Sequence, residues 1–391
     1  MLSGSEAPCA PRERPCGHPA RARGVLRALF VTWVFAVIAA FFAVSWPPLE
    51  AAEICGDNVC DAGETKQSCP QDCRPLLKLL RERRKRSNRA PRAATTAETG
   101  TLRPGDSRET VIVNGRERTY LLHLPTGYSS AKWYPLVLLF HGGSGSGQKI
   151  AGQTGFREYA DREGFLLACP DGIEHNWSDG RGTTDAERLG VDDLAFVRAL
   201  LAQVQRRWSV DAARIYAAGP SNGGIFTYRL GCEMADVFAA IAPVIGNLAE
   251  PLATTCAPSA PLSVLAINGS SDSLIPIQGG ECCKRGDGGR LLSTESSLEI
   301  FLHTNGCATT PARAVLPTRV EDGTRVERYT YPGCAHQTEV IWYLVHGMGH
   351  GWPPKPPQAK RFAGPTSQNL DATQVIWEFF KRHAKPSQGS P

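Results

Sequence analysis

The run Pro-Leu-Val-Leu-Leu-Phe at residues 135–140 constrains the fold of this 391-residue chain more than any other feature. Six consecutive apolar residues are typical of a strand that is buried on both faces, as in a parallel sheet covered by helices. Residues 165–169 form a similar run. Further strands are predicted at 214–218, 239–244, 262–268, 325–331 and 340–346, and helices at 192–208, 223–234, 293–304 and 372–383. Alternating strands and helices predict one α/β domain over residues 107–385 with a mostly parallel sheet.

The domain is predicted to begin with a hairpin. Asn114-Gly115 separates residues 110–113 from 119–124, and this dipeptide between two strand-like segments is a strong hairpin signal. The composition, 42% apolar and 21% charged, is ordinary for a globular protein.

The segment Gly219-Pro220-Ser221-Asn222-Gly223 lies between a predicted strand and a predicted helix. A sharp strand-to-helix turn lifts a serine hydroxyl above the sheet edge, where it can act as a nucleophile. Small residues on both sides relieve the crowding of such a turn. Ser221 is therefore the candidate nucleophile.

His141-Gly142-Gly143 directly follows the first buried strand. A glycine-rich turn at that place can present backbone N–H groups to an oxyanion, so we expect Gly142 or Gly143 to act together with the N–H of Asn222. A flexible surface loop is the alternative. A phosphate-binding loop is disfavoured, because no Lys followed by Ser or Thr comes after the glycines.

A serine nucleophile needs a histidine base and a carboxylate that fixes its tautomer. Asp272 follows the strand 262–268, although a solvent-exposed turn aspartate is an alternative interpretation. Two histidines lie near the end of the strand 340–346. His350 lies in the loop, from which it can reach over the sheet, whereas His346 lies at the strand's end. The order Ser221, Asp272, His350 is the order of the α/β-hydrolase fold, and His346 stays open as a competitor.

Several motifs occur together in order: HGGSGSG, GPSNGG, SDSLIP, NGC, YPGC and GMGHGWP. Over residues 107–385 this set resembles the exported esterases known as polyhydroxybutyrate depolymerases and feruloyl esterases. The resemblance implies an α/β-hydrolase fold with the triad Ser221, Asp272 and His350, and it favours His350 over His346. It also implies that Asn176, Trp177 and Trp352 are structural or shape the substrate site.

The same resemblance implies the disulfides Cys232–Cys256 and Cys307–Cys334. Cys169 has no obvious partner, and the adjacent Cys282 and Cys283 lie in an insert, CCKRGDGG, that departs from the family pattern. From Cys55 onward the number of cysteines is odd, which leaves one thiol or an unusual bond between neighbours unexplained. Asn268-Gly269 stands where the family usually has His-Gly.

Residues 1–52 predict export. Five arginines precede an apolar stretch at 28–46, and small residues follow it, as in a secretory signal peptide. The stretch nearly reaches the length of a membrane span, so a retained N-terminal anchor is the alternative. Both interpretations place the remaining chain outside the cytoplasm.

Residues 53–73 form a small cysteine-rich module. The four cysteines are Cys55, Cys60, Cys69 and Cys73, and close cysteines in an exported chain predict disulfides. A zinc site is the alternative, disfavoured by the absence of C-x2-C pairs. Acidic residues in the module could also gather around calcium, although keeping a small module soluble explains them as well.

Residues 74–106 are predicted to be a basic, extended or disordered linker, because like charges repel and the segment is too polar to bury a core. The net charge of +5 arises from this linker and the N-terminus, so it does not predict nucleic-acid binding.

The predicted function is that of an exported serine esterase that needs neither a metal nor an organic cofactor. Its substrate is expected to be an ester, with polyhydroxyalkanoates and plant cell-wall esters as polymeric candidates. A serine peptidase on the same fold and a non-catalytic cell-surface binding protein are the alternatives. The sequence does not predict the oligomeric state.

Overall fold

The computed structural model describes residues 104–283, 287–354 and 363–386. The predicted signal or anchor, the cysteine-rich module and all but the last three residues of the predicted linker lie outside these ranges, and so do the disulfides expected there. No helix within the described ranges has the length and apolar character needed to cross a membrane.

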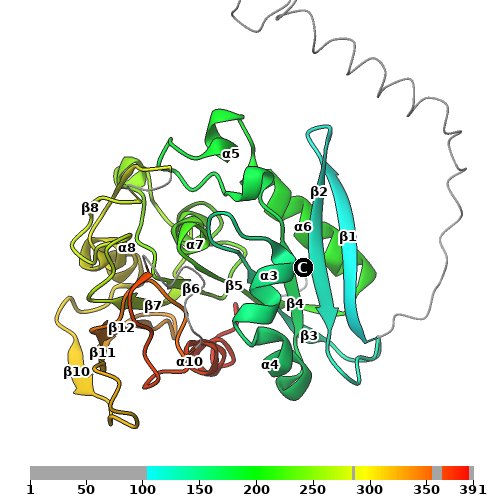
Figure 1. The fold of residues 1–391 in the computed structure, drawn as a ribbon. Helices are drawn as coiled ribbons and strands as arrows, with labels where there is room; N and C mark the ends of the chain where they lie inside the picture. The colour runs from blue at the N-terminus through cyan, green and yellow to red at the C-terminus, as the bar shows by residue number, and fades with distance from the viewer. Residues whose placement is uncertain (1–103, 284–286, 355–362, 387–391) are drawn as a thin grey trace, which may run out of the picture. The chain divides into compact units, whose positions relative to one another are not determined.

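The described residues form one large sheet in the order β1-β2-β4-β3-β5-β6-β7-β12-β11-β10 (Figure 1). The six central strands, β4, β3, β5, β6, β7 and β12, run parallel to one another. The strands outside them, β1 and β2 at one edge and β11 and β10 at the other, pair antiparallel. The strands are β1 Gly105–Val113, β2 Arg116–Leu124, β3 Tyr134–Leu139, β4 Leu166–Pro170, β5 Val210–Pro220, β6 Ala240–Val244, β7 Ser263–Gly269, β10 Ala312–Val315, β11 Arg325–Tyr331 and β12 Val340–His346. A small separate ribbon pairs β8 Gly280–Glu281 with β9 Arg290–Leu291.

Helices cover both faces of the sheet (Figure 1). Every residue of β3 is buried, with Leu136 and Leu138 packing into one core and Val137 and Leu139 into the other. This alternation follows from the pleat, which turns successive side chains to opposite faces. The first core includes residues of α6 Asp193–Arg207, α7 Asn222–Glu233 and α8 Thr294–Asn305, and the second includes residues of α3 Gly147–Gln153, α4 Phe156–Glu163 and α10 Ala372–Phe380.

The predicted fold class, an α/β-hydrolase fold with a mostly parallel sheet, is confirmed. The hairpin at Asn114-Gly115 also forms, and both residues have positive φ angles. Several elements were not predicted from the sequence: β8, β9, β10, α3, α4, the short helix α5 Asp185–Arg188 and the 3-10 turns η1 Ile173–His175 and η2 Glu250–Leu252. Glycine-rich residues before α3 had suggested a loop, but Ser146 caps the helix by accepting a hydrogen bond from the N–H of Lys149.

Two disulfides bind loops to the helical layer. Cys232–Cys256 joins the end of α7 to the segment after η2, and Cys307–Cys334 joins the end of α8 to the segment after β11. Both confirm the pairing that the family resemblance implied. The remaining described cysteines are free thiols: Cys169, Cys282 and Cys283.

Candidate active site

Ser221 lies at a sharp turn between the last residue of β5, Pro220, and the first residue of α7, Asn222. Its φ of 57° and ψ of −127° are strained for a non-glycine residue, as a nucleophile elbow requires. The helix approaches strand β3 so closely that a Cβ atom on Gly223 would lie 2.3 Å from the carbonyl oxygen of Phe140. Glycine is therefore required beside the serine for steric reasons.

Asp272 and His350 come from loops that follow two paired parallel strands, β7 and β12. Because both loops leave the same edge of the sheet, the side chains meet: Asp272 Oδ2 lies 2.7 Å from His350 Nδ1. The other oxygen, Oδ1, accepts the backbone N–H groups of Leu274 and Ile275 at 2.9 Å each. The carboxylate is thus held from both sides, and its side chain is only 1% exposed.

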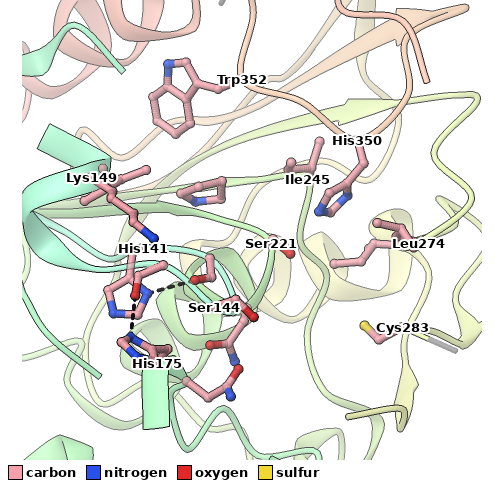
Figure 2. Close-up of a pocket in the computed structure, with 18 of the residues that line it drawn as sticks. His141, Ser144, Lys149, His175, Ser221, Ile245, Leu274, Cys283, His350 and Trp352 are labelled. Carbon is pink, nitrogen blue, oxygen red and sulfur yellow. Dashed lines mark hydrogen bonds between the residues drawn. The ribbon is translucent and has the colours of Figure 1, made fainter. Parts of the chain in front are cut away.

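His346 occupies a different environment. Its Nε2 atom lies 3.2 Å from Glu327 Oε1, a carboxylate of β11 that also pairs with Arg313 and Arg325. His350 instead lines the cavity that contains Ser221, and Figure 2 shows its imidazole turned toward the serine. The structure therefore brings Ser221, Asp272 and His350 together and leaves His346 in an ion-pair cluster.

His141 orients the glycine-rich loop. Its Nε2 accepts the N–H of Gly172 at 2.9 Å, so the proton is on Nδ1, which donates to the carbonyl of Gly142 at 2.8 Å. Burial lowers the pKa of His141, which favours this neutral form. Because a trans peptide points its C=O and N–H in opposite directions, anchoring the Gly142 carbonyl fixes the direction of the Gly143 N–H.

The side chain of Asn222 anchors the residue after the nucleophile. Its Oδ1 accepts the N–H of Trp177 at 2.9 Å, and its Nδ2 donates to Asp179 Oδ2 at 2.7 Å. Asp179 is fully buried and pairs with Arg181, whose Nη2 is 2.8 Å away. Together these contacts fix the side chain of Asn222 at the start of α7. Asp179 and Arg181 were not predicted from the sequence, because their spacing matches no recognised motif.

Ser221 and His350 line a cavity of about 820 Å³. Figure 2 shows Trp352 at one end, Lys149 and His175 on one side, and Leu274 and Cys283 on the opposite side. The predicted residues Gly142, Gly143, Asn176, Asn222 and Trp352 all belong to the lining.

Trp177, in contrast, is fully buried and lies behind the cavity wall. It stacks on Phe226, and its Nε1 donates to the carbonyl of His141 at 2.8 Å. Its position is therefore that of a structural support for the glycine-rich loop, one of the two roles expected for it. The described residues contain no cluster of acidic, histidine and cysteine side chains arranged to hold a metal ion.

Comparison with known proteins places the chain in a family. Residues 118–265 match the family model described as esterase PHB depolymerase. The chain is 30% identical over 278 residues to the putative esterase NocK of Nocardia uniformis subsp. tsuyamanensis, which covers 69% of this chain and 80% of that protein. The chain belongs to the esterase PHB depolymerase family.

Other known proteins and solved structures resemble this chain of the PHB depolymerase family more distantly. Feruloyl esterase D of Neurospora crassa is 27% identical over 294 residues, 72% of this chain and 87% of its own. The solved acetyl xylan esterase from Aspergillus awamori aligns with a TM-score of 0.49 and 13% identity over 71% of this chain and 99% of its own. The family model covers Ser221 and the glycine-rich loop and ends before Asp272 and His350.

Proposed function

We propose that this protein is a serine carboxylic-ester hydrolase that works through an acyl-enzyme. The single observation that supports it best is the 2.7 Å contact between Asp272 and His350 in the cavity that also contains the elbow serine, Ser221. A nucleophile, a histidine and a carboxylate in contact with that histidine are the components of acyl transfer.

In the proposed mechanism Ser221 Oγ attacks the ester carbonyl while His350 Nε2 removes its proton. Asp272 keeps the other ring nitrogen protonated and stabilises the imidazolium that forms. His350 then protonates the leaving alcohol, which gives the acyl-enzyme. Water attacks this ester next, with His350 again accepting the proton, and Ser221 is released with the acid product.

The negative charge on the tetrahedral intermediates requires fixed hydrogen-bond donors. The proposed donors are the backbone N–H groups of Gly143 and Asn222. His141 orients the first through the Gly142 carbonyl, and Asp179 helps to orient the second through the Asn222 side chain. The N-terminus of α7 adds a favourable dipole at the same place.

The proposed substrates are esters whose acid part is a feruloyl or a hydroxyalkanoate group, free or attached to a polymer. Named relatives include feruloyl esterases, and the family model is that of PHB depolymerases. A cavity of about 820 Å³ has room for an acyl group of this size, and Leu274, Ile275 and Trp352 give it apolar walls.

Action outside the cytoplasm is part of the proposal. It is supported by the signal-like N-terminal sequence and by two disulfides in the described domain, since disulfides persist in oxidising compartments.

A substrate panel tests the proposal: methyl ferulate, hydroxybutyrate oligomers, acetylated xylan, p-nitrophenyl esters of increasing acyl length and peptide anilides. We expect ester cleavage that is lost in Ser221→Ala while the melting temperature stays within a few degrees. Faster cleavage of the anilides would assign the site to a peptidase, and full ester turnover by Ser221→Ala would refute the nucleophile.

A further inference from the structure

Cys282 and Cys283 lie side by side in the wall of the catalytic cavity. Cys283 lines the cavity, on the side where Figure 2 shows Leu274, whereas Cys282 is 2% exposed. The Cys283 thiol donates to Cys282 Sγ with the sulfur atoms 2.8 Å apart. No step of the proposed ester hydrolysis uses either thiol.

The backbone holds the two residues in this arrangement. The N–H of Cys282 donates to the carbonyl of Gly289 at 3.0 Å, and the N–H of Cys283 donates to the carbonyl of Leu274 at 2.9 Å. Cys283 has a φ of 56°, a conformation that a side-chain-bearing residue adopts only when its surroundings impose it. The sulfur contact is thus a product of the fold and not of a freely rotating surface pair.

A cationic side chain borders the pair. Arg181 Nη1 lies 3.5 Å from Cys282 Sγ, and the same guanidinium pairs with the buried Asp179. The hydrogen bond from Cys283 and the charge of Arg181 lower the pKa of Cys282, whereas the same hydrogen bond and burial raise the pKa of Cys283. In the resting pair the shared proton is therefore on Cys283 and the thiolate is on Cys282. Transfer of that proton across the 2.8 Å contact places the thiolate, the form that attacks disulfides, on Cys283, the sulfur that lines the cavity.

The chain also meets an oxidant during its maturation, because the same domain contains Cys232–Cys256 and Cys307–Cys334. The Cα atoms of adjacent residues are about 3.8 Å apart. In this chain the Cα atoms of Cys307 and Cys334 are bridged at 3.9 Å. The sulfur atoms of Cys282 and Cys283 are already 2.8 Å apart, so a bond of about 2.0 Å requires them to approach by less than about 1 Å.

We propose that Cys282 and Cys283 are a redox modification site, in which a small-molecule disulfide oxidises the two thiols to a disulfide between neighbours, and that this ring then forms part of the cavity wall.

The exchange has two steps. Cys283, the residue that faces the cavity, passes its proton to Cys282 and attacks the incoming disulfide; a mixed disulfide forms and one thiolate leaves. Cys282 then passes that proton to the released thiolate and attacks the Cys283 sulfur, which expels the second half of the oxidant as a thiolate. This thiolate takes up from solvent the proton that Cys282 released when it ionised. Two protein thiols are oxidised and one external disulfide is reduced to two thiols, so protons and electrons balance.

Oxidation alters contacts on both sides of the proposed catalytic centre. The carbonyl of Leu274 accepts the N–H of Cys283, and the N–H of Leu274 donates to Asp272 Oδ1. Arg181, which contacts Cys282, holds the carboxylate that anchors Asn222. A disulfide removes the thiolate acceptor beside Arg181 and fixes the sulfur that faces the substrate. This consequence for ester turnover rests on the proposed function, whereas the oxidation itself does not.

Mass mapping of the full folded chain tests the site. After equilibration with glutathione disulfide and alkylation without reductant, the peptide containing both residues is expected to be two hydrogens lighter and unlabelled, and after mild reduction it is expected to carry a label on Cys283, the residue that lines the cavity. Cys169, fully buried with a pKa raised by burial, serves as the control for a folded chain and stays unlabelled in both samples. A label on Cys283 before reduction, or glutathione retained on either sulfur, would overturn the proposal.

Two single variants test the order of the steps. Cys282→Ser removes the resolving sulfur, so the glutathione adduct on Cys283 is expected to accumulate. Cys283→Ser leaves only the buried Cys282, and we expect little adduct. Rapid adduct formation in Cys283→Ser without any in Cys282→Ser would contradict the assigned roles.

Turnover measurements test the consequence for the cavity. The ratio of kcat/KM for methyl ferulate over p-nitrophenyl acetate is expected to differ by about tenfold between oxidised and mildly reduced enzyme, the lower end of what one changed contact in an apolar pocket produces. The variant Cys282→Ser/Cys283→Ser is expected to show no dependence on reductant. A dependence that persists in this variant would come from the structural disulfides and would overturn the consequence, while the mass result remains independent of any ester cleavage.

Discussion

Asp272 Oδ2 lies 2.7 Å from His350 Nδ1, across two loops that are 78 residues apart in the sequence. The register of β7 and β12 makes this contact possible, because the two strands are parallel neighbours and their loops leave the same edge of the sheet. A carboxylate at this position favours the tautomer with the proton on Nδ1, and in the proposed mechanism Nε2 is then the base for the serine.

Asp272→Asn tests the importance of this contact. The amide is nearly isosteric, but it does not hold the histidine in the same tautomer or stabilise its charged form. We expect kcat for p-nitrophenyl acetate to fall by about 10⁴-fold with a smaller change in KM, as in other serine triads. Steady-state kinetics at several pH values provide the measurement.

Asp192→Asn is the matched control. Asp192 caps α6 by accepting the N–H of Ala195, and asparagine caps helices equally well. Its activity is expected to stay within about twofold of the wild type, since surface changes rarely cost more than ~0.5 kcal/mol. Equal losses in the two variants would show that the Asp272 effect is not specific to the triad.

The two histidines at and after the end of β12 give a second test. His350→Ala removes the proposed base, and we expect kcat/KM to fall by at least about 10³-fold. His346→Ala removes only one of the side chains that contact Glu327, so turnover is expected to remain near the wild-type value and the melting temperature to drop slightly. The reverse ranking of the two variants would reassign the base.

Much of the fold could be predicted from the sequence, because buried parallel strands are continuous apolar runs and the elbow has a local signature. Ser221 could be identified as the candidate nucleophile from the residues next to it in the chain. The local sequence distinguishes His350 from His346 less clearly, because the two lie four positions apart near the end of the same strand. In the structure their tertiary partners differ: Asp272 contacts His350, and Glu327 contacts His346. The resemblance to the esterase family supplied what the local pattern did not.

The network behind the site could not be predicted. Asp179 and Arg181 resemble ordinary loop charges in the sequence, and only the folded chain shows them buried beneath Asn222. Helix α3 was missed for a related reason: its glycine-rich start suits a loop, and its stability depends on packing Ile150 against the sheet. Buried polar contacts between distant segments have no periodicity that a sequence pattern could reveal.

Asn222→Ala tests whether this network positions the oxyanion donor. The substitution keeps the backbone N–H but removes the amide that binds Trp177 and Asp179. We expect kcat to fall by about 10- to 100-fold with little change in KM, because a donor displaced by a fraction of an ångström stabilises the transition state less than the ground state. Kinetics with p-nitrophenyl acetate and thermal melting are measured on the same samples.

Asn305→Ala is the matched control for that variant. Asn305 is also a buried amide, and it bonds both the N–H and the carbonyl of Leu262. It is not among the residues that line the cavity. Both variants are expected to lose stability by about 1–3 kcal/mol, since each leaves buried backbone or side-chain groups unsatisfied. Only Asn222→Ala is expected to lose turnover; an equal loss in Asn305→Ala would attribute the effect to general destabilisation.

The Glu327 cluster makes stability depend on pH. The hydrogen bond from Arg313, followed by those from Tyr329 and His346, lowers the pKa of Glu327 far below its ordinary value of 4.5. A group whose pKa is lowered in the folded state stabilises the fold above its unfolded pKa and loses that contribution as the pH falls toward the folded pKa.

The free energies of urea unfolding of Glu327→Gln and the wild type should therefore differ most above about pH 5. The difference is expected to shrink as the pH falls below 4.5. Glu117→Gln, at an exposed position on β2, is the control and should show a small, constant difference. A difference for Glu327→Gln that did not change with pH would contradict the assigned cause.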